Sequence, residues 1–330
     1  MRCTDLHAHL TPLGVIEYLE RGGDARREDE RLVLPAALSG FPEGTPMPFP
    51  REQWDLELRI AQNRERGISK QVLSVPPYFF GYAFSAERGA HVARLANDDL
   101  AHAVAAYPDE LLAFATVPLQ AVGAAVAELE RTRSLGFAGV EIGTNIAGVE
   151  LDDPKLEPFW AACAALDATV FLHPHHQIGA ARAQDYYLHN LLANPAETGL
   201  AAARLIFGGV LERHAVRILL SHCGGILPHI AGRLDHGYRV RLECATIPLP
   251  PSAYLSRFWF DTIAHDTHTL QSTIDRVGVE RIVVGTDAPF DMGITSPLAP
   301  VDALQLSPSA YEAIAYRNAD ALLPRAKALS

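Results

Sequence analysis

The chain has 330 residues, with 28 Lys or Arg against 39 Asp or Glu, which gives a formal net charge of −11 at pH 7. This acidic balance argues against a general binder of nucleic acids or anionic membranes, because the dominant attraction to phosphate would have the wrong sign. Hydrophobic residues make up 48% and charged residues 20%, which is typical of a globular protein and not of a disordered one.

The cysteines and the N-terminus bear on the cellular compartment. The four cysteines form no CxxC pair, which argues against a zinc knuckle or a small disulfide framework. The N-terminal residues lack the apolar stretch of a signal peptide, and no run of about 18 uncharged apolar residues occurs. We therefore expect a cytoplasmic protein that binds neither membranes nor nucleic acid.

Short apolar runs alternate with helical patterns along the whole chain. The predicted strands are 3–7, 71–75, 112–117, 139–142, 169–172, 217–221, 258–261 and 282–285. The predicted helices are 54–66, 87–107, 122–135, 157–166, 196–207, a short one after Pro228, 267–277 and 311–323. Eight such units predict an α/β fold, a closed (β/α)8 TIM barrel, as one domain over residues 1–330.

Two further points concern this architecture. An open doubly wound sheet is the structural alternative, but no GxGxxG turn follows the first strand. Residues 12–50 are rich in Gly and Pro, and we interpret them as an insertion after the first strand that folds over the mouth of the barrel.

Polar residues gather at the carboxyl ends of the predicted strands. His7 and His9 end the first strand, and side chains two apart in a strand point to the same side. His173, His222 and Asp287 follow the fifth, sixth and eighth strands. In a (β/α)8 barrel these ends meet at one face, where active sites are built. The alternative of solvated strand ends explains each histidine singly but not their common position.

These donors predict a metal site. Nitrogen and oxygen ligands without thiolate suit Zn²⁺, with Mn²⁺ or Fe²⁺ as alternatives. His7, His9, His173 and Asp287 would leave a further coordination position for water or substrate. His222 is the natural general acid/base, because imidazole exchanges protons near neutrality; the alternative is a fifth ligand or a donor to one.

The landmarks of the chain form an ordered series. They are Asp5-Leu6-His7-Ala8-His9, Trp54-Asp55, Asn97-Asp98-Asp99, Val140-Glu141-Ile142-Gly143, His173-Pro174, Pro195-Ala196-Glu197-Thr198, Ser221-His222-Cys223-Gly224-Gly225, Gly232-Arg233-Leu234-Asp235 and Gly285-Thr286-Asp287-Ala288-Pro289-Phe290. Over nearly the whole chain this series resembles the amidohydrolase superfamily and, more closely, its aminocarboxymuconate-semialdehyde decarboxylase family.

The resemblance implies a zinc-dependent nonoxidative decarboxylase of an unsaturated or aromatic carboxylic acid. It implies that the four predicted ligands hold the metal and that His222 is catalytic. Our own hypothesis adds that Asp287, as a ligand close to the substrate, shares in proton transfer. It also implies a homodimer in which Arg233 reaches the neighbouring subunit's pocket to hold a substrate carboxylate, for which the planar fork of arginine is suited. Phe290, in the last landmark, is expected to contact substrate.

The departures from the family pattern fall in the substrate pocket. A second carboxylate-binding arginine of the family is replaced by Met47, and Arg51 in the same loop is the candidate to take its place. Family aromatic residues are replaced by Asn190 and Ala288, and the family's His-Gly-Gly-Gly contains Cys223 in its second position. The metal set is thus intact, whereas the recognition set is altered.

Two rival functions use the same residues. A metal-dependent hydrolase or hydratase acting on a ring-cleavage product or related carboxylate needs the same metal, water and histidine. A non-catalytic metal-binding protein is the more remote alternative, because it leaves the acid/base groups at the catalytic face unexplained.

Overall fold

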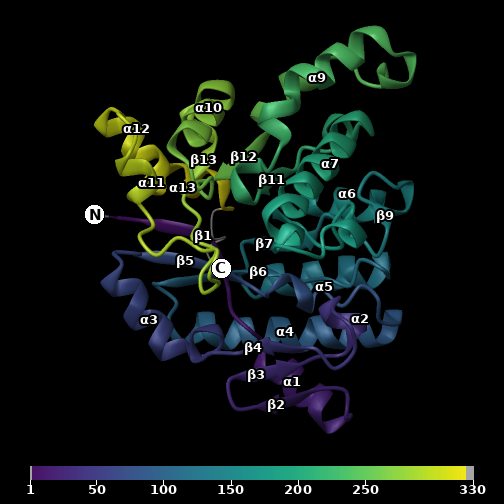
Figure 1. The fold of residues 1–330 in the computed structure, drawn as a ribbon, viewed down its shortest axis with the longest axis vertical. Helices are drawn as coiled ribbons and strands as arrows, with labels where there is room; N and C mark the ends of the chain where they lie inside the picture. Colours follow the sequence, from purple (N-terminus) through teal and green to yellow (C-terminus); the bar gives the residue numbers. More distant parts are fainter. Residues whose placement is uncertain (1, 325–330) are drawn as a thin grey trace.

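A barrel of eight parallel strands forms the centre of the computed structural model, which describes residues 2–324 (Figure 1). The strands, in their order around the barrel, are β1 (Thr4–His9), β5 (Lys70–Ser74), β6 (Leu111–Ala115), β7 (Gly139–Gly143), β10 (Thr169–His173), β11 (Arg217–Leu220), β12 (Phe258–Asp261) and β13 (Ile282–Val283). The barrel closes where Leu6 N donates to Val284 O at 2.9 Å and His9 N to Ala288 O at 2.8 Å. The predicted (β/α)8 fold is confirmed.

Helices cover the outside of the barrel, as the alternating pattern predicts. They are α3 (Leu56–Glu65), α4 (Ala86–Ala106), α5 (Val122–Ser134), α6 (Glu157–Ala165), α7 (Asn194–Phe207), α9 (Leu227–Val240) and α10 (Thr267–Val277). None of the helices in residues 2–324 has the length and hydropathy that a bilayer-spanning segment needs.

Two helical predictions differ from the structure. The helix at Pro228 is not short: α9 has 14 residues, and Pro228 does not interrupt it, because it occupies the first turn, where no main-chain N–H is needed. The predicted helix 311–323 is divided into α12 (Pro308–Glu312), a π-helical turn (Ala313–Arg317) and α13 (Asn318–Leu322).

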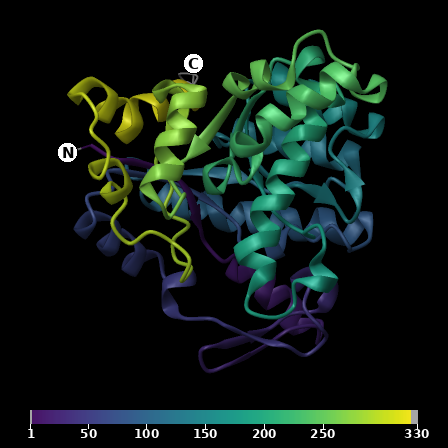
Figure 2. The same cartoon turned by 45° about the horizontal axis from the view of Figure 1, so that its top comes forward.

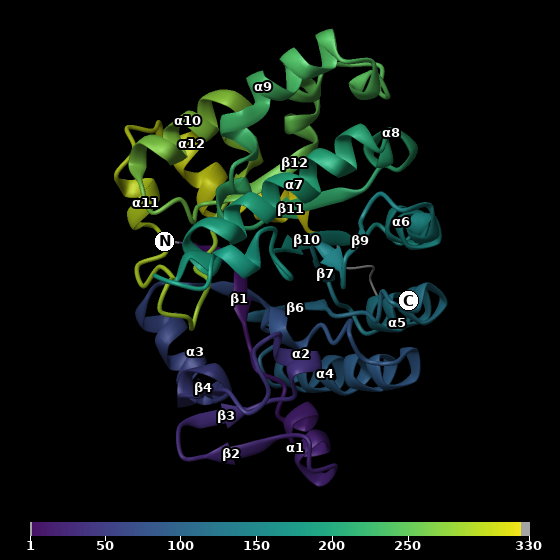
Figure 3. The ribbon, with the colours of Figure 1, turned by 45° about the vertical axis from the view of Figure 1, so that its right-hand side comes forward.

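The segment after β1 forms a small layer of its own. It contains α1 (Leu13–Arg21), α2 (Ala36–Ser39) and an antiparallel sheet of β2 (Arg26–Glu28), β3 (Arg31–Val33) and β4 (Pro46–Pro48). Gly14 N donates to Asp99 Oδ2 at 2.7 Å and so ties this layer to α4. In Figures 1 to 3 this layer and α9 lie at opposite ends of the molecule.

The barrel interior is apolar at one end and polar at the other. One cluster contains residues from successive strands and is closed by α13; its buried members are Leu6, Val72, Phe114, Ala138, Phe171, Leu219, Val283, Ala319 and Leu322. The ring of His7 packs edge-on against Phe171 of this cluster, with 4.7 Å between the ring centroids. The register of β1 against β5 shifts between Asp5 and Ala8. At this point of β1, Leu6 belongs to the apolar cluster, whereas His7 belongs to the polar end of the barrel and packs on the cluster. The polar residues thus rest on a rigid apolar base.

Candidate metal centre

Four predicted ligands converge above the apolar base. His7 and His9 come from β1, His173 ends β10, and Asp287 follows β13. One potential ligand atom from each lies within 4.8 Å of the others, and all four residues are buried. His7 Nε2 and His9 Nε2 are 3.2 Å apart, and Asp287 Oδ1 lies 3.4 Å and 3.2 Å from these two nitrogens. The structure therefore brings together the set that the strand ends indicated.

Contacts on the outer side of each ring turn its Nε2 inward. His7 Nδ1 lies 2.7 Å from Asp261 Oδ2, so an N–H on this nitrogen donates to the carboxylate. His9 Nδ1 lies 3.0 Å from the main-chain oxygen of Val75, and His173 Nδ1 lies 3.2 Å from that of the next residue. Because each Nδ1 has an acceptor, the neutral ring keeps its Nε2 lone pair for a cation.

The cluster fits a metal ion on two counts. His173 Nε2 and Asp287 Oδ1 are buried, and within residues 2–324 neither has a hydrogen-bond partner. Leaving such groups unpaired costs on the order of 1–3 kcal/mol each, which one cation offsets for several groups at once. Three imidazole nitrogens and one carboxylate oxygen are also donors that suit Zn²⁺, Mn²⁺ or Fe²⁺.

The electrostatics of the metal-free cluster point the same way. Burial disfavours a charged His7, but the carboxylates of Asp287 and Asp261 raise its pKa to about 10. Burial lowers the pKa of His9 and, together with the neighbouring imidazoles, lowers that of His173 well below its usual value. The pKa of Asp287 is held well below its usual range, because His7, His222 and His9 outweigh burial. The buried carboxylates therefore favour a positive charge at this site, which either a proton on His7 or a bound cation would supply.

His222 lies beside this cluster. Its Nε2 is 3.6 Å from Asp287 Oδ2, and its side chain is 17% exposed, so it contacts both the cluster and solvent. Its ring centroid lies 5.2 Å from that of His7 and 5.1 Å from that of His173. His222 is thus placed to move protons between solvent and a molecule bound at the cluster.

The three predicted substrate-binding residues have different positions. Phe290 lies at the cluster, with its ring centroid 5.4 Å from that of His9. Arg51 has a 68% exposed side chain and pairs with Asp55, to which its Nε donates at 3.1 Å. Arg233 is exposed on α9. Within residues 2–324 neither arginine makes a hydrogen bond or ion pair with the cluster.

Sequence reasoning missed two buried carboxyl groups. Asp261 ends β12, and the rule that strand ends carry the site would have found it. Glu141 lies in β7 with Oε1 3.8 Å from His9 Nδ1, and burial raises the pKa of this carboxyl well above its usual value. Its signals were its charge within an otherwise apolar strand and its place in the Val140-Glu141-Ile142-Gly143 landmark.

Comparisons with known proteins agree with this geometry. The Amidohydro_2 (amidohydrolase) family model matches residues 4–325. The chain is 36% identical over 248 residues to 2-amino-3-carboxymuconate-6-semialdehyde decarboxylase of Dictyostelium discoideum, covering 74% of this chain and 69% of that protein. It is 30% identical over 291 residues to gamma-resorcylate decarboxylase of a Rhizobium species, covering 80% and 87%.

A solved structure carries a metal in a similar fold. Dihydroxybenzoic acid decarboxylase of Polaromonas sp. JS666, with bound manganese and the inhibitor 2-nitroresorcinol, superposes with a TM-score of 0.79 at 25% identity. The match covers 98% of this chain and 97% of that one.

Removing one ligand should abolish tight metal binding. We expect His173→Ala to weaken Mn²⁺ or Zn²⁺ binding to the metal-stripped protein by ~100-fold or more, since even mutation of residues behind a ligand costs 10–100-fold. The matched control is His175→Ala, which removes a buried histidine of the same segment that lies outside the four-residue group. Calorimetric titration checks both; equal losses in the two variants would contradict the assignment.

Proposed function

The chain belongs to the amidohydrolase family, and from this membership and the geometry of the centre we propose that it is a metal-dependent nonoxidative decarboxylase, a carbon–carbon lyase. The substrate we propose is an unsaturated or aromatic carboxylic acid. The observation that carries the proposal is the placement of His222, 3.6 Å from Asp287 and partly open to solvent, beside a buried set of metal-binding atoms. The activities named for the relatives, on a carboxymuconate semialdehyde and on dihydroxybenzoates, support the substrate class.

The metal we propose is Zn²⁺, held by His7, His9, His173 and Asp287, with Mn²⁺ or Fe²⁺ as alternatives. The donor set accommodates each of these ions, and the manganese of the Polaromonas relative supports a divalent cation. When bound, the ion supplies Lewis acidity toward a substrate oxygen.

The residues of the chain would handle the proton. Decarboxylation breaks the bond between the carboxylate group and the substrate carbon that carries it. The electron pair of this bond stays on that substrate carbon, and CO₂ is released. His222 donates a proton to this carbon and recovers one from solvent, to which its side chain is open. Asp287 Oδ2 lies 3.6 Å from His222 Nε2, which supports a share for Asp287 in the proton transfer. Phe290 beside His9 supplies an apolar wall for an unsaturated or aromatic ring.

The surroundings of the site are part of the proposal. We propose that residues 12–50 cover the barrel mouth within a single domain, and that Arg51 exchanges Asp55 for a substrate carboxylate. We further propose a homodimer in which Arg233 enters the partner's site, which the exposure of Arg233 on α9 supports. The four free cysteines, three of them buried, support a cytoplasmic location.

The direct test is release of CO₂. We expect metal-loaded protein to release CO₂ without any oxidant from at least one member of a panel of hydroxybenzoates, carboxylated pyrimidines and muconate semialdehydes. Metal-stripped protein and His173→Ala serve as controls, and membrane-inlet mass spectrometry measures the gas. Incorporation of ¹⁸O from water into product without CO₂ would instead establish a hydrolase or hydratase.

Removing the proton donor should separate turnover from metal binding. We expect His222→Ala to retain its metal and to lose ~10²–10⁴-fold in kcat, the usual contribution of general acid–base catalysis. His229→Ala, which removes an exposed histidine of α9, is the control and should behave like the parent protein. Turnover by His222→Ala at the parent rate would remove this residue from the mechanism.

A mixing experiment tests the shared site. His222→Ala and Arg233→Ala homodimers should each have low activity, since each site lacks one of the two residues. After subunit exchange, a mixed dimer contains one site with both residues intact, so activity should rise well above that of either parent. Absence of this recovery, with sedimentation showing that exchange occurred, would place Arg233 outside the partner's site.

A further inference from the structure

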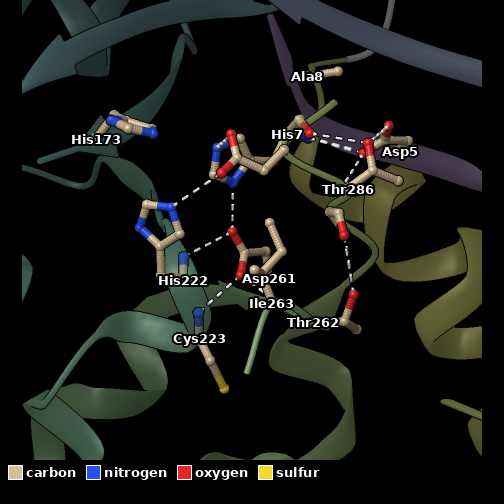
Figure 4. Close-up of polar contacts among 12 residues, drawn as sticks. Asp5, His7, Ala8, His173, His222, Cys223, Asp261, Thr262, Ile263 and Thr286 are labelled. Carbon is tan, nitrogen blue, oxygen red and sulfur yellow. Dashed lines mark hydrogen bonds and ion pairs between the residues drawn. The ribbon is translucent and has the colours of Figure 1, made fainter. Parts of the chain in front are cut away.

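One buried carboxylate connects a metal ligand to the turn that carries His222. Asp261 Oδ2 lies 2.7 Å from His7 Nδ1 and accepts the main-chain N–H of His222 at 2.9 Å. Oδ1 accepts the main-chain N–H groups of Cys223 at 2.8 Å and Ile263 at 3.0 Å. The side chain of Asp261 is fully buried. Figure 4 shows this carboxylate between the ring of His7 and the turn.

The turn after β11 has a backbone conformation that its residues do not favour. His222 has a φ of 52° and Cys223 a φ of 55°, both in the left-handed region. A side chain with a Cβ is strained there, whereas glycine is not. Cys223 is also fixed by packing, with Sγ 3.4 Å from Thr273 Oγ1. Besides the main-chain hydrogen bonds within the turn, the Asp261 carboxylate accepts the N–H of both left-handed residues.

We propose that Asp261 is a positioning residue that sets the His7 ring and the His222 turn together. It holds the proton on His7 Nδ1, so that Nε2 faces the other ligands. It also holds the turn so that His222 Nε2 lies 3.6 Å from Asp287 Oδ2. The part that concerns turnover rests on the proposed role of His222, whereas the part that concerns the metal ligand does not.

Asp261→Asn tests both parts, because it preserves shape but turns one acceptor oxygen into an NH₂ group that faces N–H donors. We expect the Kd of the metal-stripped protein for Mn²⁺ to rise ~10–100-fold. At saturating Mn²⁺ we expect kcat to fall ~100-fold with KM within ~3-fold, as for a displaced proton donor. The control is Asp153→Asn, which alters a carboxylate that accepts the N–H of Lys155 at 2.8 Å outside the cluster. Unchanged Kd and unchanged kcat in Asp261→Asn would overturn the proposal.

A second substitution separates positioning from general stabilisation. Glycine adopts the left-handed conformation without a Cβ penalty. Adding Cys223→Gly to Asp261→Asn should therefore restore kcat ~2–5-fold at saturating metal while the Mn²⁺ Kd stays weakened. A carboxylate that merely stabilised the fold would give no such split. Failure of Cys223→Gly to restore any kcat would refute the role of Asp261 in holding the turn.

The unsubstituted protein provides a test that does not need Asp261→Asn to fold. In the metal-free protein, the main-chain N–H groups of His222 and Cys223 should exchange with solvent as slowly as those of the β12 ladder. Exchange as fast as in exposed loops would contradict the proposal that Asp261 holds this turn in place. Exchange and Mn²⁺ affinity are independent of the reaction, so a protein that releases no CO₂ would contradict the proposed function and leave the test of Asp261 intact.

Discussion

The main constraint on this structure is the gathering of three imidazoles and a carboxylate within 4.8 Å of one another in a buried site. The closure of the barrel is what makes this possible. Asp287 N donates to His7 O at 2.8 Å, and His9 N donates to Ala288 O at 2.8 Å, so the main-chain bonds that join the first and last strands also set three ligands. Closure of the barrel therefore places His7, His9 and Asp287 beside one another. A cation then offsets the cost of the unpaired atoms that closure leaves inside.

Much of this centre follows from sequence because parallel strands impose a simple rule. Residues just after buried strands share one face, and His173, His222 and Asp287 all satisfy this rule although more than 100 residues separate the first from the last. Asp261 is the last residue of its strand, and extending the rule to strand-end residues would have added it. Glu141 is different, because it lies within a strand and its inward orientation depends on its neighbours. The π-helical turn before α13 contains the buried residues Ile314 and Ala315, and it too depends on packing that periodicity does not encode.

Substrate recognition was harder to predict, and the structure shows why. The role of an exposed arginine depends on the group with which it pairs, and the sequence did not reveal that Arg51 pairs with Asp55. Asp55 also caps α3, because its side chain accepts the N–H of Leu58 at 3.0 Å. Releasing Arg51 would leave Asp55 in place as the helix cap, so the exchange would not unfold α3. Arg233, in contrast, is exposed on a helix at the opposite end of the molecule from the layer after β1. The role that we propose for it requires a second chain, which a single sequence does not describe.

The turn at His222 contains a departure from the family pattern that affects the backbone strain of the turn. The His-Gly-Gly-Gly pattern of the family that the sequence resembles has glycine at this position, whereas this chain has Cys223 at a φ of 55°, where a Cβ adds backbone strain. The compensation is visible, because Asp261 accepts both N–H groups of the strained pair while it orients His7. A single carboxylate thus links the ring of His7 to the turn that carries His222, so the position of His222 depends on a residue outside the four-residue cluster.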